Sequence, residues 1–244
     1  MDVTAPQFWI GVLQIIAIDV LLGGDNAVVI ALACRRLAPA QRNKAIFWGV
    51  FGAIALRVIL IFFAITLLRI PFLKIVGALL LLWIGVRLLL PEGDGGHEVA
   101  ASERLLGAIR TIVVADAVMS LDNVIAIAGA AGDSMVLIIF GLLVSVPIIV
   151  WGSKIVLHLM ERLPWIITAG GALLGWIAGG MLVHDAAVTH WVSANAPWLG
   201  IAGPVVGAVL VVAFGKLFGA HMARRPPATV DLAEREGMPP SDSH

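Results

Sequence analysis

Seven apolar stretches, each long enough to cross a lipid bilayer, dominate this sequence. They cover roughly residues 8–33, 45–68, 72–90, 105–130, 135–159, 164–183 and 200–220. A membrane-spanning helix needs about 20 mostly apolar residues, and these runs are continuous rather than alternating, which argues against a membrane β-barrel. The charged fraction of 13% is also well below the roughly 25% of soluble domains. We therefore predict an all-α, polytopic membrane protein with seven transmembrane helices.

The basic residues indicate how the chain crosses the membrane. The first loop between spans carries Arg35, Arg36, Arg42 and Lys44, whereas the fourth and sixth loops carry no Lys or Arg. Cytoplasmic loops of membrane proteins have an excess of these residues. We therefore predict that the N-terminus lies outside the cytoplasm and the C-terminus inside it.

Carboxylates recur inside two of the apolar stretches, in the same pattern. Residues 19–26 and residues 116–123 both read Asp, five residues, Asp-Asn, at an offset of 97. A charged side chain at the bilayer centre costs roughly 2.5–3.5 kcal/mol on insertion scales. One such set could serve only to hold helices together through hydrogen bonds between polar side chains, but a duplicated set favours a functional site. The candidate site residues are Asp19, Asp25, Asn26, Asp116, Asp122 and Asn123.

The duplication extends over whole spans. At the same offset of 97, Arg57 in the second span matches Lys154 in the fifth, and Pro71 aligns with Pro164 after a four-residue deletion. The unit contains three spans, so its second copy is an inverted repeat, which places a shared site near the membrane midplane. The predicted parts are 1–90 (first three-helix repeat), 91–104 (cytoplasmic linker), 105–183 (second three-helix repeat), 184–220 (external loop and an extra seventh helix) and 221–244 (disordered cytoplasmic tail).

Arg57 and Lys154 are the basic residues at equivalent positions of the two repeats. An unpaired cation in hydrocarbon is costly, as an unpaired carboxylate is, so we predict both residues as counter-ions of the aspartates. If each neutralises one of the four aspartates, two negative charges remain, and one divalent cation would balance them. Protonation of an aspartate could replace any charge in this count.

Helix geometry adds a constraint on the first motif. Asp19 and Asn26 nearly share a helix face, whereas Asp25 would point about 120° away from Asp19 on an unbroken helix. The three side chains converge only if the helix breaks, and Gly23-Gly24 is where it could, because glycine is a poor helix former. The second copy has Ser-Leu at this place, so its break should be weaker. Carboxylate and amide oxygens without His or Cys suit hard cations such as Mg²⁺, Ca²⁺ or Mn²⁺.

The blocks at residues 22–31 (LGGDNAVVIA) and 120–126 (SLDNVIA) resemble the signature of the TerC family. The short seven-span form is similar to the YjbE-type branch, within the wider LysE-like transporter grouping. This resemblance covers roughly residues 8–220 and implies a bacterial inner-membrane protein that exports metal ions, with Mn²⁺ as the favoured ion. It also implies that the acidic motif residues named above are the metal ligands, with Mn²⁺ or another hard divalent cation as transported substrate and no permanently bound cofactor.

Other functions compete with metal export. We expect no enzyme: the chain lacks an ATP-binding Gly-x4-Gly-Lys-Ser/Thr loop, and Leu-Gly-Gly-Asp at residues 22–25 differs from the Gly-x-Gly-Asp of presenilin-like aspartyl proteases. Export of a small organic solute such as an amino acid stays open, because Arg57 or Lys154 could bind its carboxylate. A membrane adaptor without transport is a further alternative. The expected partners are a divalent metal ion and the lipid bilayer, but not nucleic acid, and the sequence leaves homo-oligomerisation open.

Overall fold

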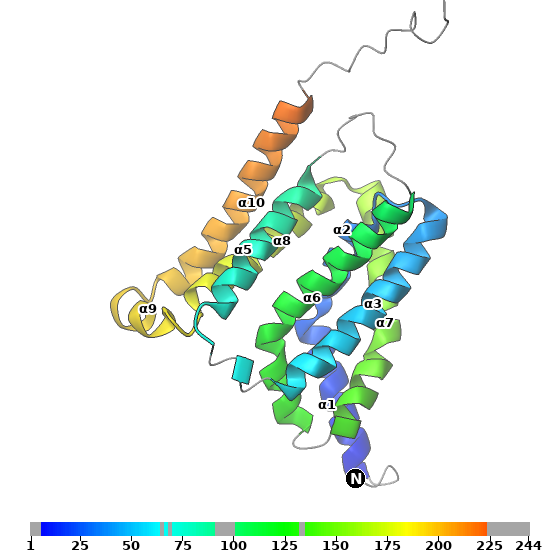
Figure 1. The fold of residues 1–244 in the computed structure, drawn as a ribbon, viewed down its shortest axis with the longest axis vertical. Coiled ribbons are helices and arrows are strands. Elements are labelled where there is room, and N and C mark those ends of the chain that lie inside the picture. The colour runs from blue at the N-terminus through cyan, green and yellow to red at the C-terminus, as the bar shows by residue number, and fades with distance from the viewer. Residues whose placement is uncertain (1–5, 64–65, 68–69, 91–100, 132–134, 224–244) are drawn as a thin grey trace, which may run out of the picture.

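The computed structural model describes residues 6–63, 66–67, 70–90, 101–131 and 135–223. Within these residues the chain is all-α, as predicted, with nine helices and no strand (Figure 1). The helices are α1 (Pro6–Leu22), α2 (Gly24–Cys34), α3 (Pro39–Phe62), α5 (Leu73–Leu89), α6 (Ala101–Ala131), α7 (Met135–Arg162), α8 (Trp165–Val183), α9 (Thr189–Asn195) and α10 (Leu199–Ala223). Most of the predicted linker (91–104) and tail (221–244) lies outside the described residues.

Several of these helices are long and apolar enough to cross a membrane. Four qualify in the described part of the chain: α3, α7, α8 and α10. A fifth span results if α1 and α2, which meet at a bend of 51°, are counted as one. α5 has only 17 residues, and α6 carries several charged residues along its length. The chain is therefore a multi-pass integral membrane protein, while the count of seven spans stays a prediction.

The helices form two groups (Figure 1). α5, α8 and α10 lie together in one, and α1, α2, α3, α6 and α7 in the other. Buried apolar side chains join the groups, among them Val29 of α2, Leu81 of α5, Met119 of α6 and Leu174 of α8. Both copies of the acidic motif lie in the second group, on α1–α2 and on α6.

Small residues allow α3 to approach α6 closely. Ala45, Gly49 and Ala53 recur every four residues on the buried face of α3, and this spacing keeps side chains on one helix face. A Cβ on Gly49 would lie 2.7 Å from Cδ1 of Ile112 in α6, so a larger residue would push the helices apart. Arg57 is the next residue in this register, and its side chain therefore enters the space between the helices.

α10 is held to α8 by direct backbone contact. A Cβ on Gly175 of α8 would lie 2.3 Å from the carbonyl oxygen of Gly207 in α10, and a Cβ on Gly179 would lie 2.1 Å from that of Gly203. Close backbone approach at small residues is a common way for helices to pack in membranes. Although α10 lies outside the predicted repeats, it is therefore an integral part of the fold.

Asp185, in the turn between α8 and α9, caps the start of α5. Its carboxylate accepts hydrogen bonds from the backbone N–H groups of Phe72 (2.9 Å), Lys74 (3.0 Å) and Ile75 (3.3 Å), and the first N–H groups of a helix have no partner within it. Burial alone would raise the pKa of Asp185, but these donors and the N–H of Ala187 hold it below its usual value. Sequence reasoning gave this residue no role, because it treated the segment only as an external loop.

We predict that Asp185→Asn lowers stability at neutral pH, because hydrogen bonds to a charged acceptor are stronger than those to an amide. The folded-state pKa is lowered, so the contribution of Asp185 is present above the ordinary value of 3.8 and is lost as the pH falls through the lowered pKa. Thermal unfolding of both proteins in detergent should show a stability gap that is constant from about pH 7 to about pH 5 and narrows as the pH falls further, to about pH 3. A gap that is constant over this range would contradict the capping role.

Candidate functional site

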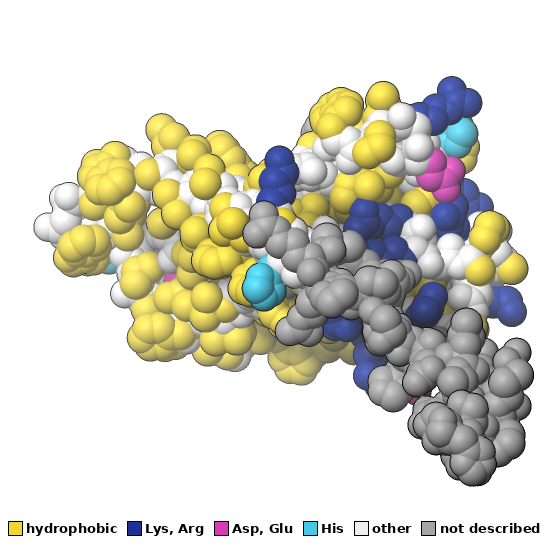
Figure 2. All heavy atoms as spheres, turned by 90° about the horizontal axis from the view of Figure 1, so that it is seen from above, with side chains coloured by type: hydrophobic (Ala, Val, Ile, Leu, Met, Phe, Trp, Pro, Cys, Tyr) yellow, Lys and Arg dark blue, Asp and Glu magenta, His cyan; other side chains and the backbone are white. Residues whose placement is uncertain are grey.

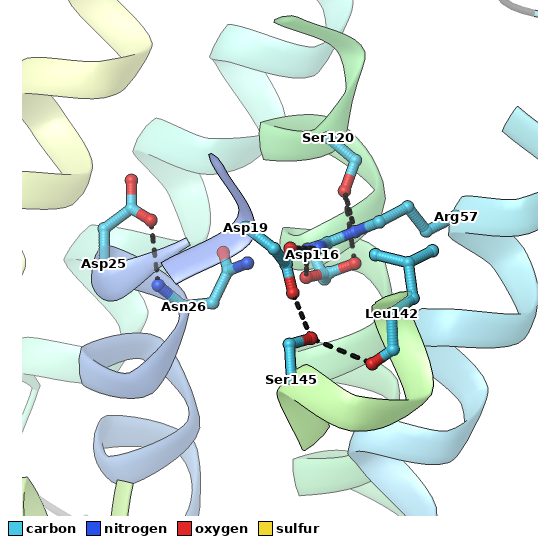
Figure 3. A network of polar contacts seen from close by, with 8 residues as sticks. All are labelled: Asp19, Asp25, Asn26, Arg57, Asp116, Ser120, Leu142 and Ser145. Atoms are coloured by element: carbon cyan, nitrogen blue, oxygen red, sulfur yellow. Dashed lines mark hydrogen bonds and ion pairs between the residues drawn. The ribbon is translucent and has the colours of Figure 1, made fainter. Parts of the chain in front are cut away.

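The guanidinium group of Arg57 lies between two carboxylates in the interior of the helix bundle (Figure 3). Its Nη1 donates to Oδ1 of Asp19 on α1, and its Nη2 donates to Oδ1 of Asp116 on α6 at 2.5 Å. Arg57 and Asp19 are each only 2% exposed, and Asp116 is 7% exposed. A charge removed from water in this way needs a partner of opposite sign. Arg57 therefore has the counter-ion role that the sequence predicts, with Asp19 and Asp116 as its partners.

Two serine hydroxyls complete the network. Ser120, one turn after Asp116 on α6, accepts a hydrogen bond from Nε of Arg57 at 2.9 Å and donates to Oδ2 of Asp116 at 3.2 Å. Ser145 on α7 shares its hydroxyl between Oδ2 of Asp19 and the backbone oxygen of Leu142. The network thereby connects α1, α3, α6 and α7. Each carboxylate is bonded through both of its oxygens, as a buried ionic group requires.

The first motif breaks at Gly23, as the sequence predicts. α1 ends at Leu22, and α2 starts at Gly24. A Cβ on Gly23 would lie 2.3 Å from the backbone oxygen of Asp19, so a side chain at this position would clash with backbone. The second copy of the motif lies within the unbroken helix α6, which agrees with the weaker break expected there.

The break turns Asn26, but not Asp25, toward the network (Figure 3). Oδ1 of Asp25 accepts the backbone N–H of Asn26 at 2.9 Å, and its half-buried carboxylate lies on the side of α2 away from Arg57. The expected convergence of Asp19, Asp25 and Asn26 is therefore only partial. The reason is geometric: α2 resumes at Gly24, so Asp25 and Asn26 are already successive helical residues and point about 100° apart.

Asn26 is buried without hydrogen-bond partners for its side chain. It is 4% exposed, and neither Oδ1 nor Nδ2 has a partner among the described residues. A buried polar group in this state costs roughly 1–3 kcal/mol, so its presence points to a ligand. Asn26, Arg57 and Asp116 line a cavity of about 20 Å³ whose other walls are apolar. Such a volume holds about one water-sized species.

Among the described side chains, Asn123 and Lys154 do not line this cavity. The side chain of Asp122 lies outside the described part of the chain, and Asn123 is half-buried on α6. Lys154 is exposed on α7 and makes no ion pair with a described aspartate, so its expected pairing is not seen. The adjacent Ser153 is the buried residue at this level, and one residue further along a helix points about 100° away. Among the described side chains no three from His, Cys, Asp or Glu form a metal-binding group.

Sequence reasoning missed Ser145. Its only signal is a polar residue within the apolar first part of α7, two positions before Pro147, which lies inside the helix. Polar side chains near a proline can bond the backbone groups that a helical proline leaves unpaired. The sequence therefore suggests only a hydrogen bond within the same helix for such a serine, although here its hydroxyl also bonds Asp19 on another helix.

These features define a multi-pass membrane protein with a buried ion-paired network next to a small cavity that is lined by three polar side chains and otherwise apolar. The chain belongs to the Integral membrane protein TerC family, whose sequence model matches residues 4–222. It is 49% identical over 179 residues to the uncharacterized membrane protein YjbE of Bacillus subtilis (strain 168), covering 73% of this chain and 82% of that protein. Identity to the uncharacterized membrane protein YceF of the same organism is 28% over 184 residues, covering 72% and 71%. No solved structure matches the chain.

We predict that Arg57→Ala lowers the stability of the protein in detergent by about 3–5 kcal/mol, because it leaves buried carboxylates without their counter-ion. Combining it with Asp19→Asn or Asp116→Asn should recover part of this loss, since one of the two stranded charges is removed. Thermal unfolding of the single and double variants measures the coupling.

Lys154→Ala is the matched control for this experiment. It removes a basic residue at the repeat-equivalent position, but Lys154 is exposed, so its effect should be small. Strict additivity in both double variants, or an equal loss in the control, would refute the role of Arg57 as a buried counter-ion.

Proposed function

We propose that this protein is a secondary transporter that exports a divalent metal cation, with Mn²⁺ as the first candidate, from the cytoplasm of a bacterium. The observation that carries the proposal is the unsatisfied amide of Asn26, which lines a cavity together with Asp116 of the ion-paired network. Oxygen ligands from a carboxylate and an amide suit a hard cation. No His or Cys among the described residues lines this cavity, which disfavours Zn²⁺ or Cu⁺.

The charges around Arg57 support a divalent substrate. Asp19 and Asp116 carry two formal negative charges against the one positive charge of Arg57. Asp25, adjacent to Asn26 but on the side of α2 away from Arg57, adds a third negative charge, so the excess, counted over the described carboxylates of the two motifs, is two. Lys154 does not enter this count, because it is exposed on α7. One divalent cation neutralises the excess in a medium where uncompensated charge is costly.

The packing of the helices supports alternating access between two inverted repeats. The second helix of each predicted repeat packs on the motif helix of the other repeat: α3 on α6, and α7 on α1 and α2. Asp19 and Asn26 come from the first repeat and Asp116 from the second, so relative movement of the repeats would rearrange the site. Transporters built in this way place the substrate between the repeats.

The distribution of basic side chains supports the predicted orientation. Lys and Arg side chains gather at the upper end of the molecule in Figure 1, which Figure 2 shows from above. The first loop and the ends of α5 and α7 lie at this end. An excess of basic residues marks the cytoplasmic side, so we assign this end to the cytoplasm and the protein to the bacterial inner membrane.

Export of an amino acid is the alternative. That substrate needs a cationic group for its carboxylate, but the guanidinium of Arg57 is occupied by two aspartates and a serine. Lys154 is exposed on the surface of α7. The described site therefore favours a cation over a carboxylate substrate.

We predict that Asn26→Leu abolishes Mn²⁺ transport without lowering stability. Leucine has a similar size, and removing a buried group without hydrogen-bond partners should leave stability unchanged or raise it by roughly 1–3 kcal/mol. The measurement is Mn²⁺ flux into proteoliposomes that contain the full-length protein, together with thermal unfolding of the same preparation. Lys154→Ala serves as the control with unchanged flux.

The combination of the two readouts separates a ligand from a structural residue. A purely structural Asn26 would show lower stability in the leucine variant. Wild-type Mn²⁺ flux in a folded Asn26→Leu variant would refute the ligand role. Transport of amino acids, but not of Mn²⁺, by the wild-type protein would replace metal export with the alternative.

A further inference from the structure

A second pocket, of about 240 Å³, opens at the basic end of the molecule, between the last turn of α2, the last turns of α5 and the start of α6. Arg36, Arg87 and Arg104 line it, and Glu103 is the acidic residue in its wall. It shares no lining residue with the cavity beside Arg57. Among the described residues the pocket is thus a separate site in which the exposed Arg87 and Arg104 outnumber the one lining carboxylate, Glu103.

Two of the three arginines, Arg87 and Arg104, can bind an anion. Arg87 and Arg104 are exposed and make no ion pair with a described carboxylate. The guanidinium carbon of Arg87 lies 5.2 Å from the ring centre of Trp83, one turn earlier on α5, a contact that holds the charged group in place. Arginine is well suited to phosphate, because its planar fork of N–H donors can bind two phosphate oxygens at once.

Apart from Thr111, the remaining residues in the wall of the pocket are apolar or glycine, which indicates that the ligand also carries an apolar part. Leu32, Ile84 and Leu88 line the pocket on α2 and α5, and Trp83 is exposed beside them. Tryptophan is enriched where a membrane protein meets the lipid headgroups. Positive charge therefore lies at the end of the helices, and apolar surface lies deeper along them. A free inorganic anion would contact only the positive charge and would leave the apolar surface unused.

We propose that this pocket binds an anionic phospholipid, with the phosphate between Arg87 and Arg104 and an acyl chain along the apolar wall. Basic pockets between helices on the cytoplasmic side are a known form of lipid recognition. α2 connects this pocket to the candidate transport site, because it carries Asn26 in its first turn and lines the pocket at its end. A bound lipid would bridge α2, α5 and α6, and so stabilise the protein.

The test is a titration of the purified full-length protein with phosphatidylglycerol, followed by thermal unfolding in a neutral detergent. Phosphatidylcholine and inorganic phosphate are titrated in parallel. We expect phosphatidylglycerol to raise the unfolding temperature, and the other two to have little effect. In Arg87→Gln/Arg104→Gln the apparent lipid affinity should fall roughly fivefold for each arginine removed, in line with the surface electrostatics of one basic residue.

Two further variants make the test specific. Arg110→Gln/Arg162→Gln removes the same charge from exposed residues outside the pocket and should keep wild-type lipid affinity. Glu103→Gln removes the negative charge in the wall and should raise the affinity. Equal losses in both double variants would mean unspecific attraction and overturn the proposal, as would weaker binding by Glu103→Gln. If inorganic phosphate alone stabilised the protein as much as phosphatidylglycerol does, the ligand would be a free anion and the lipid proposal would be wrong.

Discussion

The structure depends on one guanidinium group shared by two carboxylates. Arg57, Asp19 and Asp116 belong to three helices far apart in sequence, and none of them could be buried alone at acceptable cost. Their pairing fixes α1, α3 and α6 relative to one another, and Ser145 adds α7. Hydrophobic packing cannot select such an arrangement by itself, because lipid is as apolar as the helices are. The ionic contacts therefore specify which helices meet at the centre.

The local sequence prepares this contact at two points. The small residues of α3 bring its backbone close to α6 at Gly49, so that Arg57, two turns later, can reach Asp116. Gly23 ends α1 immediately after the turn that carries Asp19. The chain then restarts as α2 with Asn26 facing the cavity. The break therefore presents a polar amide, without a hydrogen-bond partner among the described residues, next to a network whose carboxylates are already hydrogen-bonded.

Much of this site could be predicted, because a repeated motif and charged residues within apolar stretches can be recognised from the sequence alone. The family, the helical class, the break at Gly23 and the position of Arg57 as counter-ion of the aspartates all follow from residue pattern and the cost of buried charge. Alignment of the two repeats was less reliable for predicting the role of a residue. Lys154 matches Arg57 by offset, yet it is exposed, since helix rotation at that position is set by packing. Asp185 and Ser145 were missed because their partners lie on other helices, and only the tertiary structure brings them together.

The central claim is that the negative charge in excess of Arg57 binds a divalent cation. Its most direct test is thermal unfolding of the purified protein during titration with Mn²⁺, Mg²⁺, Ca²⁺ and Zn²⁺, for the wild type and Asp25→Asn. Asp25 takes no part in the ion pairs, so its variant should fold as the wild type does without metal. The account predicts that Mn²⁺ stabilises the wild type, by about 2.7 kcal/mol at a hundredfold excess over the dissociation constant, and that Asp25→Asn loses most of this effect. Absence of stabilisation by any of the four ions, or equal stabilisation of both proteins, would contradict it.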